Sequence, residues 1–212
     1  MSNGVPFDPV YAASDLPTFG DAPSEELFVY LKDGSLNGRA LDLGCGDGRD
    51  SLPLAHLGFR VTAIDLSETG LNKLRRFARE RGLGGRVCAV CCDIRLWEYP
   101  AEHFDLVVAV TSLDHVASED LPSLFTRIVR SLRHGGVLFA KVHTVDDPGY
   151  GVTHGPISEL SRMIKHYFAR GELMQLAQSE MEIIRYEEHQ EVDEDHGPRH
   201  SHGFATMIAV RR

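Results

Sequence analysis

The sequence predicts an α/β fold: an open, mostly parallel sheet with helices on both faces, followed by a C-terminal antiparallel hairpin. Apolar strand-like runs alternate with amphipathic helix-like segments from residue 25 to residue 143, a pattern typical of strands joined by right-handed helical crossovers. Strand-like runs such as FDLVVAV are continuously apolar, as strands buried on both faces are. Two β-rich runs near the end, joined by a short turn-rich link, favour the hairpin.

The first part of the chain is expected to be an irregular arm, because residues 1–24 contain four prolines and little periodicity. After it, Ser24 and Ser67 are expected to cap helices, and a glycine pair at 135–136 is expected to close another. The predicted strands cover 39–44, 60–66, 86–93, 104–112 and 137–143, and the predicted helices cover 24–34, 49–58, 67–83 and 121–136.

The last third of the chain has a different pattern. After a loop over 144–158, short helical segments are expected around 161–168 and 171–178. The two β-rich runs cover 181–192 and 202–212, with the acidic, turn-rich link DEDHGPR at 193–199 between them. Adjacent strands with so short a link favour antiparallel pairing.

Length and charge limit the class of protein. A chain of 212 residues with 42% hydrophobic residues can bury one core, so we expect an arm over residues 1–24, a possible lid, and a single domain over residues 25–212. The net charge of −9 opposes nucleic acid or an anionic membrane as a partner. The sequence has no secretory signal pattern and no apolar run near the ~20 residues of a membrane span. We therefore expect a cytoplasmic protein, and the sequence does not determine its oligomeric state.

The segment ALDLGCGDG places three glycines directly after a predicted strand. In an open parallel sheet, a ligand lies beyond the carboxyl ends of the strands, where the backbone amides of strand-to-helix turns meet it. Gly44, Gly46 and Gly48 would let a ligand approach more closely than a Cβ permits. A tight turn alone also explains one or two glycines, so this loop needs support from other residues.

Acidic residues at the ends of the next two predicted strands give that support. Asp65 is placed to bind two ribose hydroxyls with its two carboxylate oxygens. Asp93 is placed to accept a hydrogen bond from an exocyclic adenine amine, with Ile94 packed on the ring. Each acid alone is also consistent with a helix cap or a solvated turn. Three acids at successive strand ends, counting Asp42, predict an adenosyl ligand.

A nicotinamide-dependent oxidoreductase is one candidate for such a ligand. The turn G-x-G-x-x-G would place its third glycine at position 49, where this chain has Arg49. The match to that pattern is therefore poor. We expect Arg49 to brace Asp42 or Asp50, with anion binding as the alternative.

The motifs LDLGCGDG, IDLS, CCDI, FDLVVAVTSLDHV and LRHGGVLF follow one another over residues 40–140. In this order they resemble the class I S-adenosylmethionine-dependent methyltransferases. A narrower resemblance, to the tellurite-resistance methyltransferases and their uncharacterised relatives, is carried by GCGDGRDSLPLAHLGFRVTAID, FARGEL, RYEE and FATMIAVRR. The resemblance implies a Rossmann-like three-layer sandwich with a seven-stranded sheet, and S-adenosylmethionine as the cofactor. The cofactor-binding residues expected on this basis are Asp42, Gly44, Cys45, Gly46, Gly48, Asp65, Leu66, Asp93, Ile94 and Val110.

Methyl transfer from a sulfonium to a small-molecule acceptor is the expected reaction, and its thioether leaving group needs no proton. A soft acceptor such as tellurite, selenite or a thiolate needs no base, whereas an oxygen or amine acceptor needs one near pH 7, for which histidine is suited. Thr111, Lys141 and His143 lie at the ends of the fourth and fifth predicted strands and are the candidate catalytic residues. The alternatives are that Thr111 satisfies loop amides and that Lys141 and His143 are solvated strand-end charges.

A histidine- and acid-rich segment at 189–202 could bind zinc or nickel, or line the acceptor. We favour a solvated surface turn, because no regular element brings all of its donors to one point. Its members are His189, Asp193, Glu194, Asp195, His196, His200 and His202.

Cys88 and Cys91 form a C-x-x-C pattern, but they fall on opposite faces of a predicted strand and cannot share one ion. We expect them to be small buried residues, and we assign no metal site. A non-catalytic metal- or ligand-binding protein on the same fold is the alternative to a methyltransferase.

Overall fold

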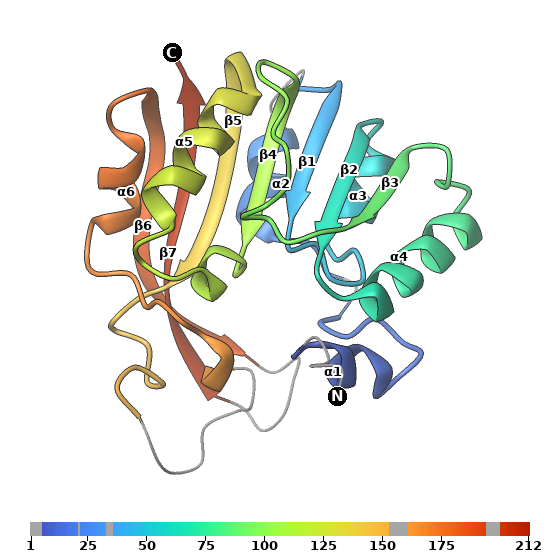
Figure 1. The fold of residues 1–212 in the computed structure, drawn as a ribbon, viewed down its shortest axis with the longest axis horizontal. Helices are drawn as coiled ribbons and strands as arrows, with labels where there is room; N and C mark the ends of the chain where they lie inside the picture. The colour runs from blue at the N-terminus through green and yellow to red at the C-terminus, as the bar shows by residue number, and fades with distance from the viewer. Residues whose placement is uncertain (1–5, 21, 33–35, 153–160, 194–199) are drawn as a thin grey trace.

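The computed structural model describes residues 6–20, 22–32, 36–152, 161–193 and 200–212. They form a seven-stranded sheet with the strand order β3-β2-β1-β4-β5-β7-β6 (Figure 1). The strands are β1 (Arg39–Leu43), β2 (Arg60–Asp65), β3 (Val87–Cys91), β4 (Phe104–Val110), β5 (Leu132–His143), β6 (Met181–Asp193) and β7 (His200–Arg211).

The first five strands are parallel and the last two form the expected hairpin. β1 pairs with β2 and β4, while β3 extends the sheet beside β2 and β5 extends it beside β4. β7 lies between β5 and β6 and is antiparallel to both. The predicted Rossmann-like α/β sandwich with a mostly parallel seven-stranded sheet is therefore confirmed. The strand order reverses between β1 and β4, which is where open sheets bind ligands.

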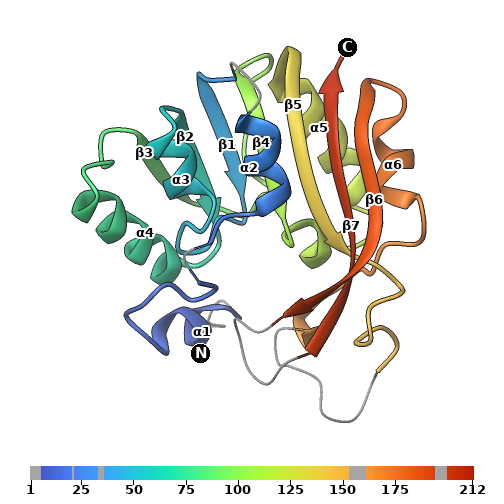
Figure 2. The same cartoon turned by 180° about the vertical axis from the view of Figure 1, so that it is seen from behind.

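Helices cover both faces of the sheet (Figure 1 and Figure 2). The helices are α1 (Asp8–Ala12), α2 (Glu25–Lys32), α3 (Ser51–His56), α4 (Glu68–Glu80), α5 (Leu121–Ser131) and α6 (Glu172–Ala177), with two 3-10 turns, η1 (Leu113–His115) and η2 (Ser161–Met163). On one face, α5 and α6 bury side chains such as Leu124 and Leu173. On the other, α2, α3 and α4 bury Leu27, Leu54 and Leu74.

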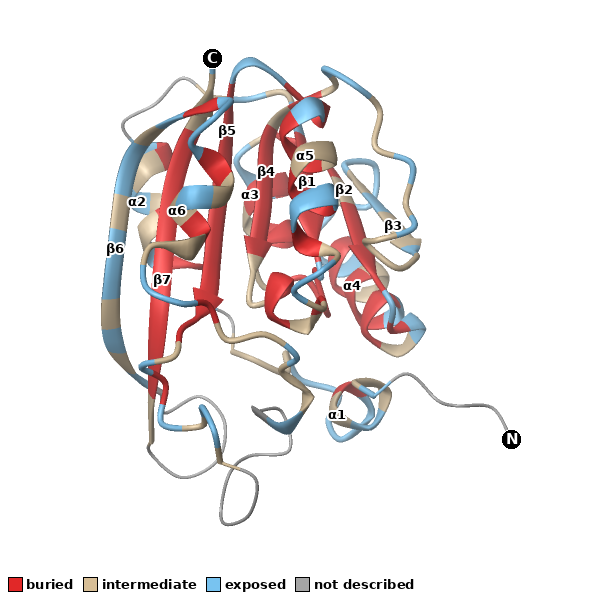
Figure 3. Ribbon diagram, turned by 60° about the vertical axis from the view of Figure 1, so that its left-hand side comes forward, coloured by how far each residue is buried: buried red, intermediate tan, exposed pale blue. Residues whose placement is uncertain are grey.

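Burial follows these layers. The interior strands β4, β5 and β7 are largely buried, whereas the edge strand β6 is mostly exposed or half-buried (Figure 3). No helix formed by the described residues has both the length and the apolar character that a bilayer crossing requires.

The helix starts agree only in part with the sequence prediction. Ser67 caps α4 as expected, accepting a hydrogen bond from the backbone N–H of Gly70 at 3.0 Å. The arm, expected to be irregular, contains helix α1, with a proline in its first turn, a position where the missing N–H costs no intrahelical bond.

Two other predictions about helices are wrong. Helix α5 ends at Ser131 and β5 begins at Leu132, because Leu132 is buried and pairs with Phe104 of β4. Residues 161–168 contain only η2, since the backbone N–H groups of Lys165 and His166 donate to the carbonyl of Asp114 instead of forming a helix. Residues 194–199 of the predicted link lie outside the described residues.

Candidate functional site

A cavity of about 510 Å³ lies at the carboxyl ends of the parallel strands, within the roughly 300–1,000 Å³ that small-molecule sites occupy. The predicted site residues that line it are Asp42, Gly44, Cys45, Gly46, Asp65, Leu66, Asp93, Ile94, Val110, Thr111, Lys141 and His143. Gly48 packs elsewhere, and a Cβ there would lie 2.4 Å from Cδ1 of Leu74. The glycine loop, the strand-end acids and the candidate catalytic residues therefore share one cavity.

Gly46 is a cavity-lining loop position where a side chain would not fit. Its φ is +53°, in the left-handed region that favours glycine. A Cβ at this position would lie 2.4 Å from the hydroxyl oxygen of Tyr11. The bare backbone therefore makes room for the arm, a reason that the sequence did not indicate.

Asp65 ends β2 and is held by two backbone amides. Its Oδ2 accepts from the N–H of Gly46 at 2.8 Å, and its Oδ1 accepts from the N–H of Ser67 at 2.7 Å. Burial raises the pKa of Asp65, and these hydrogen bonds act in the opposite direction. Because each carboxylate oxygen has a second lone pair, Asp65 can still accept hydrogen bonds from ligand hydroxyls.

Asp42 is buried beneath the glycine loop and accepts a hydrogen bond from the hydroxyl of Ser51 at 2.6 Å. Burial, and then the neighbouring carboxylate of Asp50, raise the pKa of Asp42 to about 7, while the hydrogen bond from Ser51 lowers it. A positively charged ligand in this cavity would favour the ionised form.

Asp93, at the next strand end, is braced by a residue that sequence reasoning missed. The guanidinium of Arg95 donates to both of its carboxylate oxygens, at 2.6 Å from Nη2 and 3.1 Å from Nε. Burial acts to raise the pKa of Asp93, but the hydrogen bonds from Arg95 outweigh it and lower the pKa. Asp93 is thus an ionised acceptor at the rim of the cavity.

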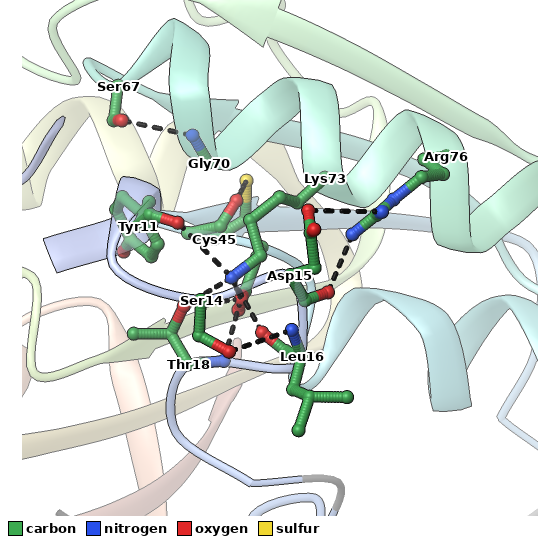
Figure 4. A network of polar contacts seen from close by, with 12 residues as sticks. Tyr11, Ser14, Asp15, Leu16, Thr18, Cys45, Ser67, Gly70, Lys73 and Arg76 are labelled. Atoms are coloured by element: carbon green, nitrogen blue, oxygen red, sulfur yellow. Dashed lines mark hydrogen bonds and ion pairs between the residues drawn. The ribbon is translucent and has the colours of Figure 1, made fainter. Parts of the chain in front are cut away.

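A buried lysine fastens the arm over the glycine loop. Lys73 of α4 donates to the carbonyl of Leu16 and the hydroxyl of Thr18, both at 2.7 Å (Figure 4). It also forms an ion pair with Asp47 of the loop at 3.0 Å. The backbone N–H and the hydroxyl of Thr18 both donate to Asp47. Arm, loop and α4 are therefore tied together by one polar network.

The end of the arm has its own contacts. Nε of Arg49 donates to the carbonyl of Ala22 at 2.8 Å, and Ser24 donates to the carboxylate of Asp50 through its N–H and its hydroxyl. The expected bracing of Asp50 by Arg49 is met only through charge: its Nε donates to the arm, while its positive charge acts to lower the pKa of Asp50 against the larger effect of burial.

Thr111 stands at the end of β4 in an unusual backbone conformation. Its φ is +47°, which is rare for a β-branched residue and costs on the order of 1–3 kcal/mol. Its N–H donates to the carbonyl of Lys141 at 2.8 Å, which holds the strained residue at the cavity. Strain of this kind tends to occur at functional sites.

His143 ends β5 and is oriented by a fully buried acid, Asp114 of η1. Oδ2 of Asp114 lies 2.8 Å from Nδ1 of His143, and Oδ1 accepts from the backbone N–H of His143 at 3.0 Å. Because an ionised carboxylate only accepts, Nδ1 must be the donor, which leaves the lone pair of the neutral ring on Nε2. His143 is buried rather than solvated.

Lys141 is also buried, so the expectation of a solvated strand-end charge is wrong for it as well. Its ammonium group contacts the carboxylate of Glu191 and lies 3.4 Å from Oε1 of Glu26. It stands 4.6 Å above the ring centre of Phe204. Two carboxylates therefore compensate its charge.

The histidine-rich segment is not uniformly a surface turn. His202 of β7 is buried and lines the cavity, and its Nδ1 lies 2.8 Å from Oδ2 of Asp147. His189 of β6 is half-buried, and His196 lies outside the described residues. The prediction of a solvated turn is therefore wrong for His202.

The cysteine prediction needs correction too. Cys88 and Cys91 of β3 are exposed, not buried core residues, while Cys45 is buried in the glycine loop.

Sequence reasoning did not predict that Asp114 contacts His143, and it named His202 only as one member of a segment with several possible roles. The signal for Asp114 was its place just past the end of a predicted strand, in TSLDHV. For His202, the signal was its position in a predicted strand next to the fifth one. The place of Asp114 or His202 in the sequence does not indicate which residue its side chain contacts.

Comparisons with known proteins add independent information. Residues 40–136, just under half of the chain, match a family described as a methyltransferase domain. A ubiquinone biosynthesis O-methyltransferase from Caulobacter vibrioides is 39% identical over 100 residues, which are 47% of this chain and 38% of that protein. The matched part thus spans about two fifths of the length of that relative.

Solved structures share the fold over most of the chain. TehB from Haemophilus influenzae has a TM-score of 0.74 and 24% sequence identity, over 89% of this chain and 62% of that one. The magnesium protoporphyrin IX methyltransferase from Synechocystis, solved with bound S-adenosylmethionine, has a TM-score of 0.63 and 18% identity, over 89% of this chain and 77% of that one.

Proposed function

We propose, on the premise that residues 40–136 are a methyltransferase domain with S-adenosylmethionine as its cofactor, that the protein methylates an oxygen atom of a small molecule. The observation that carries the choice of acceptor atom is the contact between Asp114 and His143. The cavity of about 510 Å³ is of a size for small molecules.

The cofactor half of the cavity comprises the glycine loop, Asp65 and Asp93. The residues fit an adenosyl ligand, because Asp65 offers two oxygens to ribose hydroxyls and Asp93 offers an ionised acceptor to an amine. Asp42, which lines the cavity, supplies negative charge near the ligand when it is ionised. When bound, S-adenosylmethionine supplies a methyl group on a positively charged sulfur. The protein's task is then mainly alignment, which can contribute about 7–11 kcal/mol.

The arm acts as a lid over this half. Its Tyr11 lies against Gly46, and Lys73 ties residues 16 and 18 to the loop. Such a cover keeps water from the methyl group and holds the cofactor in one orientation.

The acceptor half contains Thr111, Lys141 and His143. A hydroxyl is a poor nucleophile until it loses its proton, and His143, oriented by Asp114, is the residue that meets this hydroxyl and assists the loss. Thr111 lines the path between the two halves. That the curated relative is named an O-methyltransferase supports an oxygen acceptor.

Tellurite and selenite fit this half less well. Among the candidate catalytic residues the positive charge belongs to Lys141, whose ammonium group is already paired with Glu191 and Glu26 and so offers little free charge to an oxyanion. A thiol shares with a hydroxyl the need to lose a proton, although its lower pKa makes the need smaller.

Transfer of labelled methyl from S-adenosylmethionine to a panel of acceptors tests the proposal. The panel contains phenols, aliphatic hydroxy compounds, thiols, tellurite and selenite. We expect product with a hydroxyl compound and a loss of that activity in His143→Ala. Transfer to tellurite or selenite alone would reject the oxygen acceptor. Titration calorimetry tests the alternative. If S-adenosylmethionine gives no heat of binding but another ligand does, a non-catalytic binding protein is favoured.

A further inference from the structure

We propose that His143, Asp147 and His202 bind one divalent cation that prefers imidazole nitrogen, such as Zn²⁺ or Ni²⁺, in the acceptor half of the cavity. All three residues are buried, and one ligand atom from each lies within 4.8 Å of the others. Histidine and carboxylate are common ligands of these cations. The inference rests on the proposed function only for the role of the cation, not for its binding.

The fold brings the three residues together from separate parts of the chain. His143 ends β5, Asp147 lies in the turn that follows, and His202 lies in β7, the antiparallel neighbour of β5. The backbone N–H of Gly203 donates to Oδ2 of Asp147 at 3.1 Å, and a Cβ at this glycine would lie 2.6 Å from the backbone nitrogen of Asp147. The turn is therefore held tightly against β7, which fixes the three side chains relative to one another.

The two imidazoles meet buried carboxylates in different ways. Nδ1 of His143 is held by Asp114 at 2.8 Å, which fixes the tautomer and makes Nε2 a better ligand. Nδ1 of His202 lies 2.8 Å from Oδ2 of Asp147, so a cation bound to both atoms would replace the proton between them. The two ring centres are 5.1 Å apart. Two buried carboxylates thus accompany two imidazoles, an arrangement whose charge favours a cation.

A second group of candidate ligands, Glu26, His189 and Glu191, lies nearby. The ammonium group of Lys141 already contacts both of its carboxylates. A cation there would have to displace this charge, so the first group is the better site.

The cation would deepen the proposed function by activating the acceptor. A hydroxyl bound to it has a lowered pKa and loses its proton to water. The resulting oxyanion then attacks the methyl carbon, a C–O bond forms, and the C–S bond breaks with its electron pair remaining on sulfur. In this state His143 assists as a ligand of the cation, because a cation and a proton compete for the same nitrogen.

Equilibrium dialysis of tag-free, chelator-treated protein against ZnCl₂ or NiCl₂ tests the site without cofactor or acceptor. We expect one equivalent of bound metal. His202→Ala and the milder His202→Gln should abolish this binding, and Asp114→Asn should weaken it by about tenfold to a hundredfold. His189→Ala, in the second group, is the matched control and should bind as the wild type does. Thermal unfolding and cofactor affinity show whether each variant is folded.

The absence of saturable binding to the wild-type protein would overturn the inference, as would loss of binding in His189→Ala but not in folded His202→Gln. The two proposals can fail separately. If the protein binds S-adenosylmethionine and transfers methyl but binds neither Zn²⁺ nor Ni²⁺, the cation site is rejected and the proposed function stands. If it binds the metal but not S-adenosylmethionine, the proposed function is rejected and the cation site stands.

Discussion

Asp114 holds His143 with both of its carboxylate oxygens, one on the ring at 2.8 Å and one on the backbone N–H of the same residue at 3.0 Å. The side chain and the main chain of His143 are thus fixed by a single acid that has no solvent exposure. This acid sets which nitrogen of the ring carries the proton, and so which nitrogen can meet a substrate.

Asp114→Asn is therefore expected to lower kcat by about two to four orders of magnitude, the usual contribution of a positioned proton acceptor. The amide would keep a contact with the ring, but its NH₂ group can donate to Nδ1 and so move the ring proton to Nε2. The measurement is the rate of methyl transfer to a hydroxyl acceptor under saturating cofactor. The affinity for S-adenosylmethionine should not change, and an unchanged kcat would show that His143 does not act on the acceptor.

Asp65→Ala should weaken the binding of S-adenosylmethionine by about 1.5–3 kcal/mol, since charged hydrogen bonds are lost. The dissociation constant should rise by roughly tenfold to a hundredfold. Titration calorimetry measures it. Asp105→Ala is a suitable control, because Asp105 pairs with Arg133 at the opposite end of the strands. Equal affinities in Asp65→Ala and the wild type would contradict the placement of the ribose.

The parallel part of the fold could be predicted because its strands are buried on both faces and their sequences are continuously apolar. The strand-end acids Asp65 and Asp93 could be predicted for a related reason, since parallel strands end at one edge of the sheet. The same rule placed Lys141 and His143 at the cavity. The rule predicted where these two side chains lie, but not how exposed they are. Both are buried, although the sequence left open that they were solvated charges.

The rest depends on contacts between distant parts of the chain. His202 reaches His143 only because β7 lies beside β5 in a particular register, in which His143 pairs with Phe204. Helix α5 stops at Ser131 because the next residue pairs across the sheet with Phe104. Local sequence contains neither fact. Gly46 has a partner in the arm, Tyr11, which no local pattern indicated.

The affinity for S-adenosylmethionine should increase as the pH rises through the pKa of Asp42, which is about 7. The pKa of Asp42 in the folded protein exceeds its ordinary value of 3.8. Protonated Asp42 therefore favours the folded state at low pH, and this contribution to the free energy of unfolding is lost as the pH rises through about 7. A positively charged cofactor favours the ionised form, so binding releases a proton below this pH. We expect about a tenfold gain in affinity between about pH 6 and about pH 8.

The measurement is titration calorimetry across this pH range, with Asp42→Asn as the comparison. Asp50 and Asp65 also face this part of the cavity and have raised pKa values, chiefly through burial. The informative quantity is therefore the difference between the wild type and Asp42→Asn. If both have the same pH dependence, Asp42 does not couple to the cofactor's charge.

Removing residues 1–22, or replacing Lys73 with Met, should weaken cofactor binding if the arm is a lid. Lys73 is the buried donor that ties the arm to Asp47 of the loop. Lys73→Met removes charged hydrogen bonds to the arm and leaves Asp47 buried without its ammonium partner, a cost of about 1.5–3 kcal/mol. We expect the dissociation constant of S-adenosylmethionine to rise by about tenfold or more in both variants.

Arg75→Met on the same helix is the matched control. Its guanidinium binds Glu68, Asn72 and the carbonyl of Ala89, none of which belongs to the arm or the glycine loop. The ion pair with Glu68 is solvent-accessible, and loss of such a pair costs roughly 0–1 kcal/mol. Thermal unfolding by circular dichroism separates a loosened arm from a destabilised domain. A truncated protein that keeps its melting temperature and binds the cofactor as tightly as the full chain would mean that the arm covers the loop without contributing to binding.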